Sequence, residues 1–201
     1  MRKVILSMMT SLDGSIAKPD GDINWFRTDA GFEEEMLTLL HSVDVMLFGR
    51  VSYQLLAEFW PTAGQEASGE APGGFTTKAR EQEFATLMNE TPKIVYSRTL
   101  TAPTWGPVRV VRDGIAEDLA RMKQEPGKDI VLFAGANIGT TFINLDLVDQ
   151  YRLMIHPVII SRGIDLFGNV AAERPLTLSR TRTFDCGVIL LQYDRDRGAT
   201  S

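Results

Sequence analysis

The sequence alternates short apolar runs with stretches whose apolar residues recur at helical spacing. The run DVMLF at 44–48 precedes the helical pattern VSYQLLAEFW at 51–60, and the run DIVLFA at 129–134 precedes a short helical pattern at 137–145. Strand–helix repeats of this kind predict a mainly parallel sheet with helices on both faces. The order of the elements therefore limits the chain to the α/β class.

The same reading gives bounds for the expected elements. We expect strands at 3–9, 44–48, 92–97, 108–111, 129–134 and 151–160, and helices at 28–43, 51–60, 76–90, 115–125 and 137–145. No helical pattern separates the last two apolar stretches, 175–184 and 186–194, so they predict a C-terminal antiparallel hairpin. Residues 61–74 are rich in Gly, Ala and Pro, and we interpret them as a flexible loop within a single domain spanning 1–201.

Composition excludes several classes of function. The net charge of −5 over 201 residues argues against nucleic acid or an anionic membrane as a partner. A single cysteine and two histidines cannot build a Cys/His zinc site, so we expect no metal. No apolar run reaches the roughly 18 residues that span a bilayer. We interpret MRKVILSMMTSLDG as a strand rather than a signal peptide, and we expect a cytoplasmic protein.

Three of the apolar runs end in turns that suit an anion. Residues 49–52 (GRVS) combine a glycine, an arginine and a hydroxyl, and residues 97–99 (SRT) combine two hydroxyls with a guanidinium. Residues 133–139 (FAGANIG) hold small residues that let backbone amides approach a pyrophosphate, and Asn137 could cap the helix that follows. Taken alone, the turns at 49–52 and 97–99 are better explained as ordinary loops, and the turn at 133–139 is weak evidence because it lacks the G-x-G-x-x-G pattern. Together they predict a phosphate-binding site.

The ordered set SLDGSIA, FGRVSY, YSRTL, FAGANIG and LVDQYRLMIHPVIISRGIDLFG resembles the dihydrofolate reductase superfamily. It is most similar to the reductase domain of the bifunctional riboflavin-biosynthesis deaminase-reductase and its stand-alone relatives, over residues 3 to about 194. The resemblance implies a dihydrofolate-reductase-like three-layer sandwich and NADPH as cofactor. It also implies hydride transfer to a small pterin- or pyrimidine-like substrate, and a homodimer.

The resemblance also assigns roles to individual residues. It places Gly49, Arg50, Val51 and Ser52 at the cofactor phosphates, Ser97, Arg98 and Thr99 at the 2′-phosphate, Gly135, Ala136, Asn137 and Ile138 under the pyrophosphate, and Met9, Ile16 and Ala17 at the nicotinamide. Residues 18–26 correspond to a mobile loop that closes over the nicotinamide. Within that loop, Trp25 either walls the substrate pocket or packs structurally.

Two residues have alternative roles. Asp29 corresponds roughly to the carboxylate that binds and helps to protonate pterins in dihydrofolate reductases, but it is also an ordinary helix-capping residue. The threonine that supports this carboxylate in the family is replaced by Ile155. His156, on an apolar strand, is favoured as a core residue over a proton donor.

The function therefore has alternatives. One is reduction of 5-amino-6-(5-phosphoribosylamino)uracil in riboflavin biosynthesis. That substrate would need an additional basic pocket for its own phosphate, and only Arg27 and Arg162 are left to form one. Another is dihydrofolate reduction, which the changes at Asp29 and Ile155 weaken. A third is a non-catalytic protein that binds or senses NADP. Deaminase activity is excluded, because one cysteine cannot form the zinc signature.

Overall fold

The computed structural model describes residues 1–63 and 74–196. Residues 64–73, which make up most of the predicted loop at 61–74, lie outside the described residues. The helices are α1 (Ala30–Ser42), α2 (Arg50–Ala57), α3 (Lys78–Glu90), α4 (Ile115–Gln124) and α5 (Ala136–Asn144). The strands are β1 (Val4–Ser11), β2 (Ser15–Ala17), β3 (Val43–Gly49), β4 (Lys93–Tyr96), β5 (Val108–Val111), β6 (Asp129–Phe133), β7 (Gln150–His156), β8 (Ile164–Asp165), β9 (Leu176–Thr183) and β10 (Ile189–Arg195).

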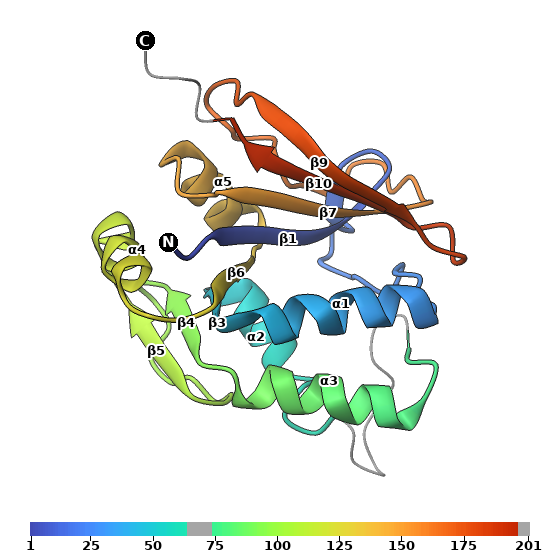
Figure 1. Cartoon of the computed structure of the whole chain (residues 1–201), viewed down its shortest axis with the longest axis horizontal. Coiled ribbons are helices and arrows are strands. Elements are labelled where there is room, and N and C mark those ends of the chain that lie inside the picture. The colour runs from blue at the N-terminus through green and yellow to red at the C-terminus, as the bar shows by residue number, and fades with distance from the viewer. Residues whose placement is uncertain (64–73, 197–201) are drawn as a thin grey trace.

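Eight of the strands form one sheet in the order β5-β4-β3-β6-β1-β7-β10-β9 (Figure 1). Every pairing from β5 to β7 is parallel. Strand β10 then pairs antiparallel with both β7 and β9. The predicted parallel sheet with a closing antiparallel hairpin is confirmed.

Successive side chains of the strands point to opposite faces of the sheet, so they pack into two hydrophobic cores, one on each face. In β3, Met46 and Phe48 pack with α1 and α3, whereas Leu47 packs with α4 and α5. In β6, Val131 and Leu132 divide between the two cores in the same way. Strands buried on both faces have to be apolar throughout, which is why these runs stand out in the sequence. Figure 1 shows α1 and α3 side by side beneath the sheet.

A buried carboxylate ties the edge hairpin to α1. Glu35 binds Arg180 through both carboxylate oxygens at 2.6 and 2.8 Å, and it also accepts from Arg182 and Arg152 at 2.8 Å each. Burial alone would raise the pKa of Glu35, but the three arginines outweigh it and lower this pKa to about 2. Glu35 of α1 is therefore the counter-charge for Arg180 and Arg182 of the hairpin.

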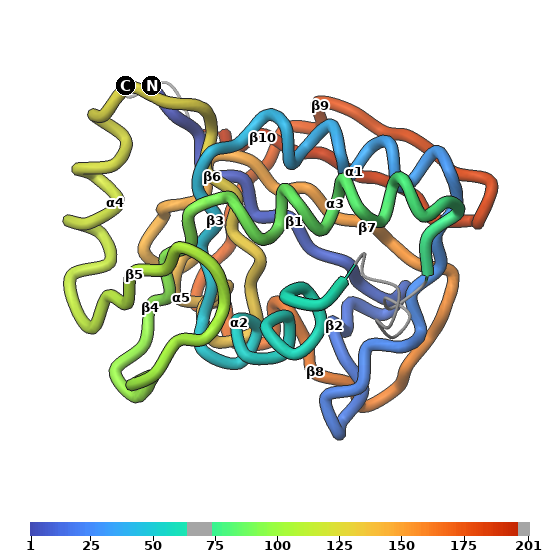
Figure 2. Tube along the Cα trace, turned by 90° about the horizontal axis from the view of Figure 1, so that it is seen from below, coloured from blue at the N-terminus to red at the C-terminus, as the bar shows by residue number. Residues whose placement is uncertain are grey.

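The helix expected at 51–60 ends at Ala57, and the structure differs from the expected elements in two further places. The strand predicted at 151–160 ends at His156, because Pro157 has no N–H to continue the ladder. In addition, β2 and β8 form a separate two-stranded antiparallel sheet that the sequence pattern does not predict. In Figure 2 this small sheet lies along the same side of the molecule as α2. No helix in the described part of the chain is long and apolar enough to cross a membrane.

Candidate active site

A cavity of about 1370 Å³ opens where the parallel strands end. Met9 of β1, Gly49 of β3, Tyr96 of β4 and Phe133 of β6 all line it. In open α/β sheets this end of the strands is where ligands bind, because helix N-termini point toward it. The volume exceeds that of a typical small-molecule pocket, so it can hold a large cofactor together with a second molecule.

The cavity brings together the three predicted turns. Its lining includes every residue that the resemblance assigned to the cofactor except Thr99, namely Met9, Ile16, Ala17, Gly49, Arg50, Val51, Ser52, Ser97, Arg98, Gly135, Ala136, Asn137 and Ile138. Thr99 is exposed and its backbone N–H donates to Ser97 Oγ, which shapes the turn from outside.

Two of these turns interlock through their glycines. A Cβ added at Gly49 would meet Ile138 Cγ2 at 3.0 Å, and one added at Gly135 would meet Ser52 Oγ at 3.1 Å. The two turns are therefore packed tightly against each other, and a Cβ at either glycine would push the facing side chain back by a few tenths of an ångström. Gly49 and Gly135 are also the N-caps of α2 and α5, and neither helix has a side-chain cap. The first amides of both helices are consequently open to an anion.

The expectation that Asn137 caps α5 is wrong, because Asn137 lies inside the first turn of that helix.

Three arginines line the cavity among the described residues. Arg50 donates to Gln54 Oε1 at 2.8 Å on the exposed side of α2. Arg98 pairs with Asp113 at 2.7 Å, and Arg112 donates to the backbone carbonyl of Arg98 at 2.9 Å. Arg112 was missed by the sequence reasoning. Its signal is the position directly after the short strand β5, the same place that Ser97 occupies after β4.

The small β2–β8 sheet forms another wall of the cavity. Ile16 and Ala17 of β2 line it together with Ile164 of β8. A Cβ on Gly163 would lie 2.6 Å from the carbonyl oxygen of Ala17, so only glycine lets the two strands approach. The predicted nicotinamide contacts at 16 and 17 are thus positioned by residues about 150 positions later in the chain.

The loop at 18–26 contributes Phe26 rather than Trp25. Phe26 lines the cavity, whereas Trp25 is outside its lining and packs edge-on against Phe26 and His156, with ring centroids 4.5 and 5.4 Å away. The structure therefore favours the packing alternative for Trp25.

His156 is a core residue, as favoured from the sequence, although its Nε2 has no hydrogen-bond partner among the described residues. It is fully buried, it stacks on Phe26, and its Nδ1 accepts the backbone N–H of Arg27 at 3.1 Å. Burial lowers the pKa of His156 to about 4, with a smaller contribution from the charge of Arg27. The ring is therefore neutral at neutral pH and holds the end of the loop that reaches the cavity.

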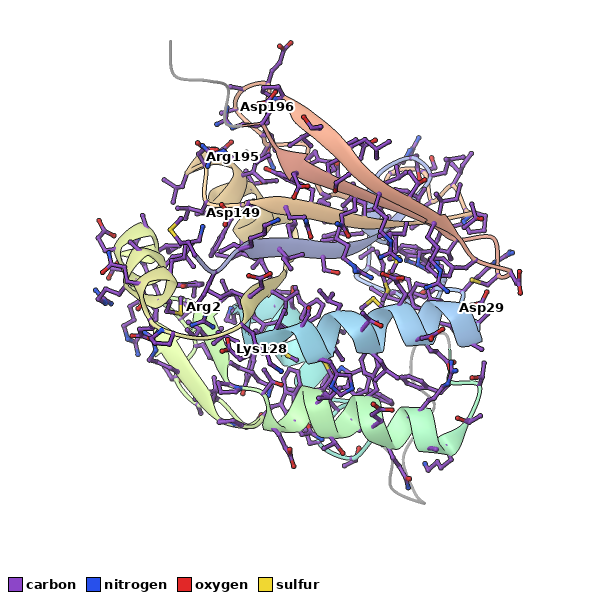
Figure 3. All side chains as sticks on the ribbon, in the orientation of Figure 1. Arg2, Asp29, Lys128, Asp149, Arg195 and Asp196 are labelled. Carbon is purple, nitrogen blue, oxygen red and sulfur yellow. The ribbon has the colours of Figure 1, made fainter. Side chains whose placement is uncertain are left out.

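Asp29 is the N-cap of α1. Its Oδ1 accepts the N–H of Phe32 at 2.8 Å and its Oδ2 accepts the N–H of Cys186 at 2.6 Å. Figure 3 shows Asp29 at the N-terminal end of the helix, near the tip of the β9–β10 hairpin. Burial raises the pKa of Asp29, but these backbone donors outweigh it, so the net pKa lies below the usual value. Asp29 is absent from the described lining of the cavity, and the structure favours the capping role.

Comparison with known proteins places this geometry in context. The family model of the RibD C-terminal domain matches residues 2–190. The uncharacterized protein YyaP of Bacillus subtilis (strain 168) is 36% identical over 194 residues, which cover 96% of this chain and 94% of YyaP.

Solved structures share the fold at much lower identity. A deaminase/5-amino-6-(5-phosphoribosylamino)uracil reductase from Thermotoga maritima matches with a TM-score of 0.66 and 16% identity, over 96% of this chain and 56% of that longer one. Dihydrofolate reductase from Enterococcus faecalis, complexed with NADP(H), matches with a TM-score of 0.58 and 10% identity, over 96% of both chains. These likenesses confirm the dihydrofolate-reductase-like fold.

Proposed function

The chain belongs to the RibD C-terminal domain family, and on that premise we propose that it is an NADPH-dependent reductase that transfers a hydride to a small heterocyclic substrate. Membership of this family and the similar solved structures support an oxidoreductase acting on a heterocycle. The cofactor and the individual site residues are our proposal.

The observation that carries the proposal is the pair of interlocked glycine turns facing one cavity. Gly49 and Gly135 leave the amides of α2 and α5 uncapped and close to each other, which fits a pyrophosphate lying across both helix ends. A dinucleotide has its pyrophosphate in the middle. It would then extend toward Arg98 on one side and toward Met9 and Ala17 on the other.

The arginine end of the cavity supports NADPH over NADH. Arg98 and Arg112 line the cavity beside Ser97, and they supply fork-shaped donors for a phosphate monoester such as the adenosine 2′-phosphate. Arg98 would exchange its exposed partner Asp113 for that phosphate, and an exposed ion pair costs little to break.

The chain itself contributes positioning and exclusion of water. Bound NADPH would supply the hydride, which adds to the carbon of a C=N or C=O bond of the substrate. Met9, Ile16 and Ala17 present an apolar wall to the nicotinamide, and Phe26 covers it from the 18–26 loop. Because both oxygens of Asp29 accept backbone N–H groups, we assign the balancing proton to water rather than to Asp29.

Cofactor titration tests the proposal. We expect NADPH to bind more tightly than NADH. Arg98→Ala and Arg112→Ala should each reduce the ratio of the two affinities about tenfold, since a charge-assisted contact contributes about 1.5–3 kcal/mol. Arg121→Ala is the matched control, because Arg121 is an exposed arginine of α4 outside the described cavity lining. Failure of both nucleotides to bind the folded protein would overturn the proposal.

Turnover separates the catalytic proposal from a sensing role. Tight NADPH binding without oxidation across a panel of pterins, pyrimidines and quinones would favour a non-catalytic NADP-binding protein. The capping role of Asp29 is the observation that keeps this second candidate open. The homodimer and the cytoplasmic location stay predictions.

A further inference from the structure

One wall of the cavity is built from two very short strands. Ile16 and Ala17 of β2 and Ile164 of β8 line the end of the cavity where we place the nicotinamide. The strands have three and two residues, and their register joins Ser15 to Asp165 and Ala17 to Ile164. An isolated two-stranded sheet is marginally stable in water. Contacts outside the pair must therefore hold this wall in place.

A carboxylate outside the described cavity lining supplies these contacts. Asp13 is exposed and lies in the turn between β1 and β2. Its Oδ1 accepts the backbone N–H of Ile160 at 3.1 Å, and its Oδ2 accepts that of Ser161 at 3.0 Å. The hydroxyl of Ser11 donates to the same Oδ1 at 2.5 Å and accepts the N–H of Ser15 at 2.9 Å. Asp13 thus links the turn before β2 to the turn before β8.

The turn that Asp13 holds has an uncommon backbone conformation. Ser161 and Arg162 both have a φ of 57°, in the left-handed region that residues with a side chain rarely adopt. Such residues persist only where surrounding contacts hold them, and the hydrogen bonds to Asp13 are contacts of this kind. Gly163 follows, and a Cβ there would lie 2.6 Å from the carbonyl oxygen of Ala17. The turn therefore packs directly against β2.

The three hydrogen bonds require an ionised carboxylate. The donor from Ser11, followed by the amides of Ser161 and Ile160, lowers the pKa of Asp13 to about 2, so this side chain is an anion at neutral pH. Asparagine has nearly the same size, but its side chain offers only one oxygen and would place an NH₂ group opposite a backbone N–H. Asp13→Asn should therefore release one of the two amides and leave the shape of the side chain unchanged.

We propose that Asp13 is a positioning residue that sets the place of the nicotinamide ring without touching the cofactor. It acts through the turn at 160–163, whose position determines where Ile16, Ala17 and Ile164 stand. This inference rests on the proposed reductase function. It gives the two ends of the cofactor separate supports, because the uncapped helices and the arginines hold the phosphates. Placement matters for hydride transfer, since an error of about 1 Å can cost roughly a hundredfold in rate.

The nucleotide 2′,5′-ADP separates the two ends of the site, because it carries the adenosine and the 2′-phosphate of NADPH but no nicotinamide. Binding of each nucleotide to the whole chain is measured by titration calorimetry. We expect Asp13→Asn to weaken NADPH binding tenfold or more and 2′,5′-ADP binding less than twofold. Asp185→Asn is the matched control. It removes the same charge from an exposed position between β9 and β10, outside the described cavity lining, and should bind both nucleotides like the wild type.

Ser11→Ala is a milder second variant, which carries the test if Asp13→Asn does not fold. It removes one hydrogen bond to Asp13 and should weaken NADPH binding about threefold, with 2′,5′-ADP binding again unchanged. Equal weakening of both nucleotides would mean that Asp13 supports the whole fold, and unchanged NADPH affinity would mean that the turn holds without it. Either result overturns the inference. A wild type that binds neither nucleotide would instead overturn the cofactor site, and the reductase proposal with it.

Discussion

Acidification should destabilise this protein through one buried histidine. The pKa of His156 falls from its ordinary value of 6.5 to about 4 in the folded state. Between these two values the unfolded chain binds a proton at this residue and the folded chain does not. Stability must therefore rise with pH across this window, and it must fall as pH drops from 6.5 toward 4.

The size of the effect follows from the two pKa values. Linkage gives a loss of about 2 kcal/mol at pH 5 and about 3 kcal/mol at pH 4, relative to neutral pH. Glu35, whose pKa is lowered from 4.5 to about 2, adds its own loss only in the more acidic range. The interval from pH 7.5 to pH 5 therefore reports mainly on His156.

Urea unfolding at half-unit pH steps would measure this dependence. His156→Asn keeps an acceptor for the N–H of Arg27 but does not titrate, so it should remove the slope between pH 7.5 and 5, whatever it costs in stability at neutral pH. His41→Asn changes the other histidine, which is exposed on α1, and should keep the slope. A wild type with flat stability over this interval, or an unchanged slope in His156→Asn, would refute the reasoning.

Three further substitutions follow from the packing. Glu35→Gln should cost about 3–5 kcal/mol in urea unfolding, because it leaves the buried Arg152 without a counter-charge, whereas Glu34→Gln on the exposed side of α1 should be near neutral. Gly163→Ala should weaken NADPH binding in a protein that still folds by circular dichroism, since its Cβ would push β8 away from Ala17; unchanged affinity would count against a cofactor role for that wall. Tyr53→Phe should lower stability by about 1–3 kcal/mol in thermal unfolding, because the buried backbone N–H of Trp105 loses its acceptor, the Tyr53 hydroxyl at 2.7 Å. A smaller loss would mean that water can replace the hydroxyl.

Much of the sheet could be predicted because its strands are buried on both faces. The run around Met46 and Leu47 has to be apolar throughout, and such runs are visible without any knowledge of pairing. The turns at Gly49 and Gly135 were recognisable for a related reason. Each follows a buried strand, and a small residue there lets the opposing turn pack closely.

What the sequence missed depends on contacts between distant or adjacent residues. Strands β2 and β8 have three and two residues, too few for a periodic signal, and their pairing depends on Gly163. Trp25 and Phe26 are adjacent aromatic residues, and nothing in the sequence indicates that Phe26, rather than Trp25, lines the cavity. Arg112 follows β5 as Ser97 follows β4, but it reaches the site only because β5 pairs in parallel with β4, and that pairing depends on contacts beyond either strand.

The central position of β1 has a consequence for biosynthesis. The N–H of Lys3 donates to the carboxylate of Asp129, 126 residues later, and the N–H of Val4 donates to that of Asp149, 145 residues later. At about 5–20 residues per second, a ribosome takes roughly 7–30 s to deliver β7 after β1. Both edges of this apolar strand stay unpaired until β6 is made, and one edge stays unpaired until β7 is made, so β1 is available to other chains during that time. The yield of this protein in a cell should therefore depend on translation speed and on chaperones that shield β1, independently of how stable the finished fold is.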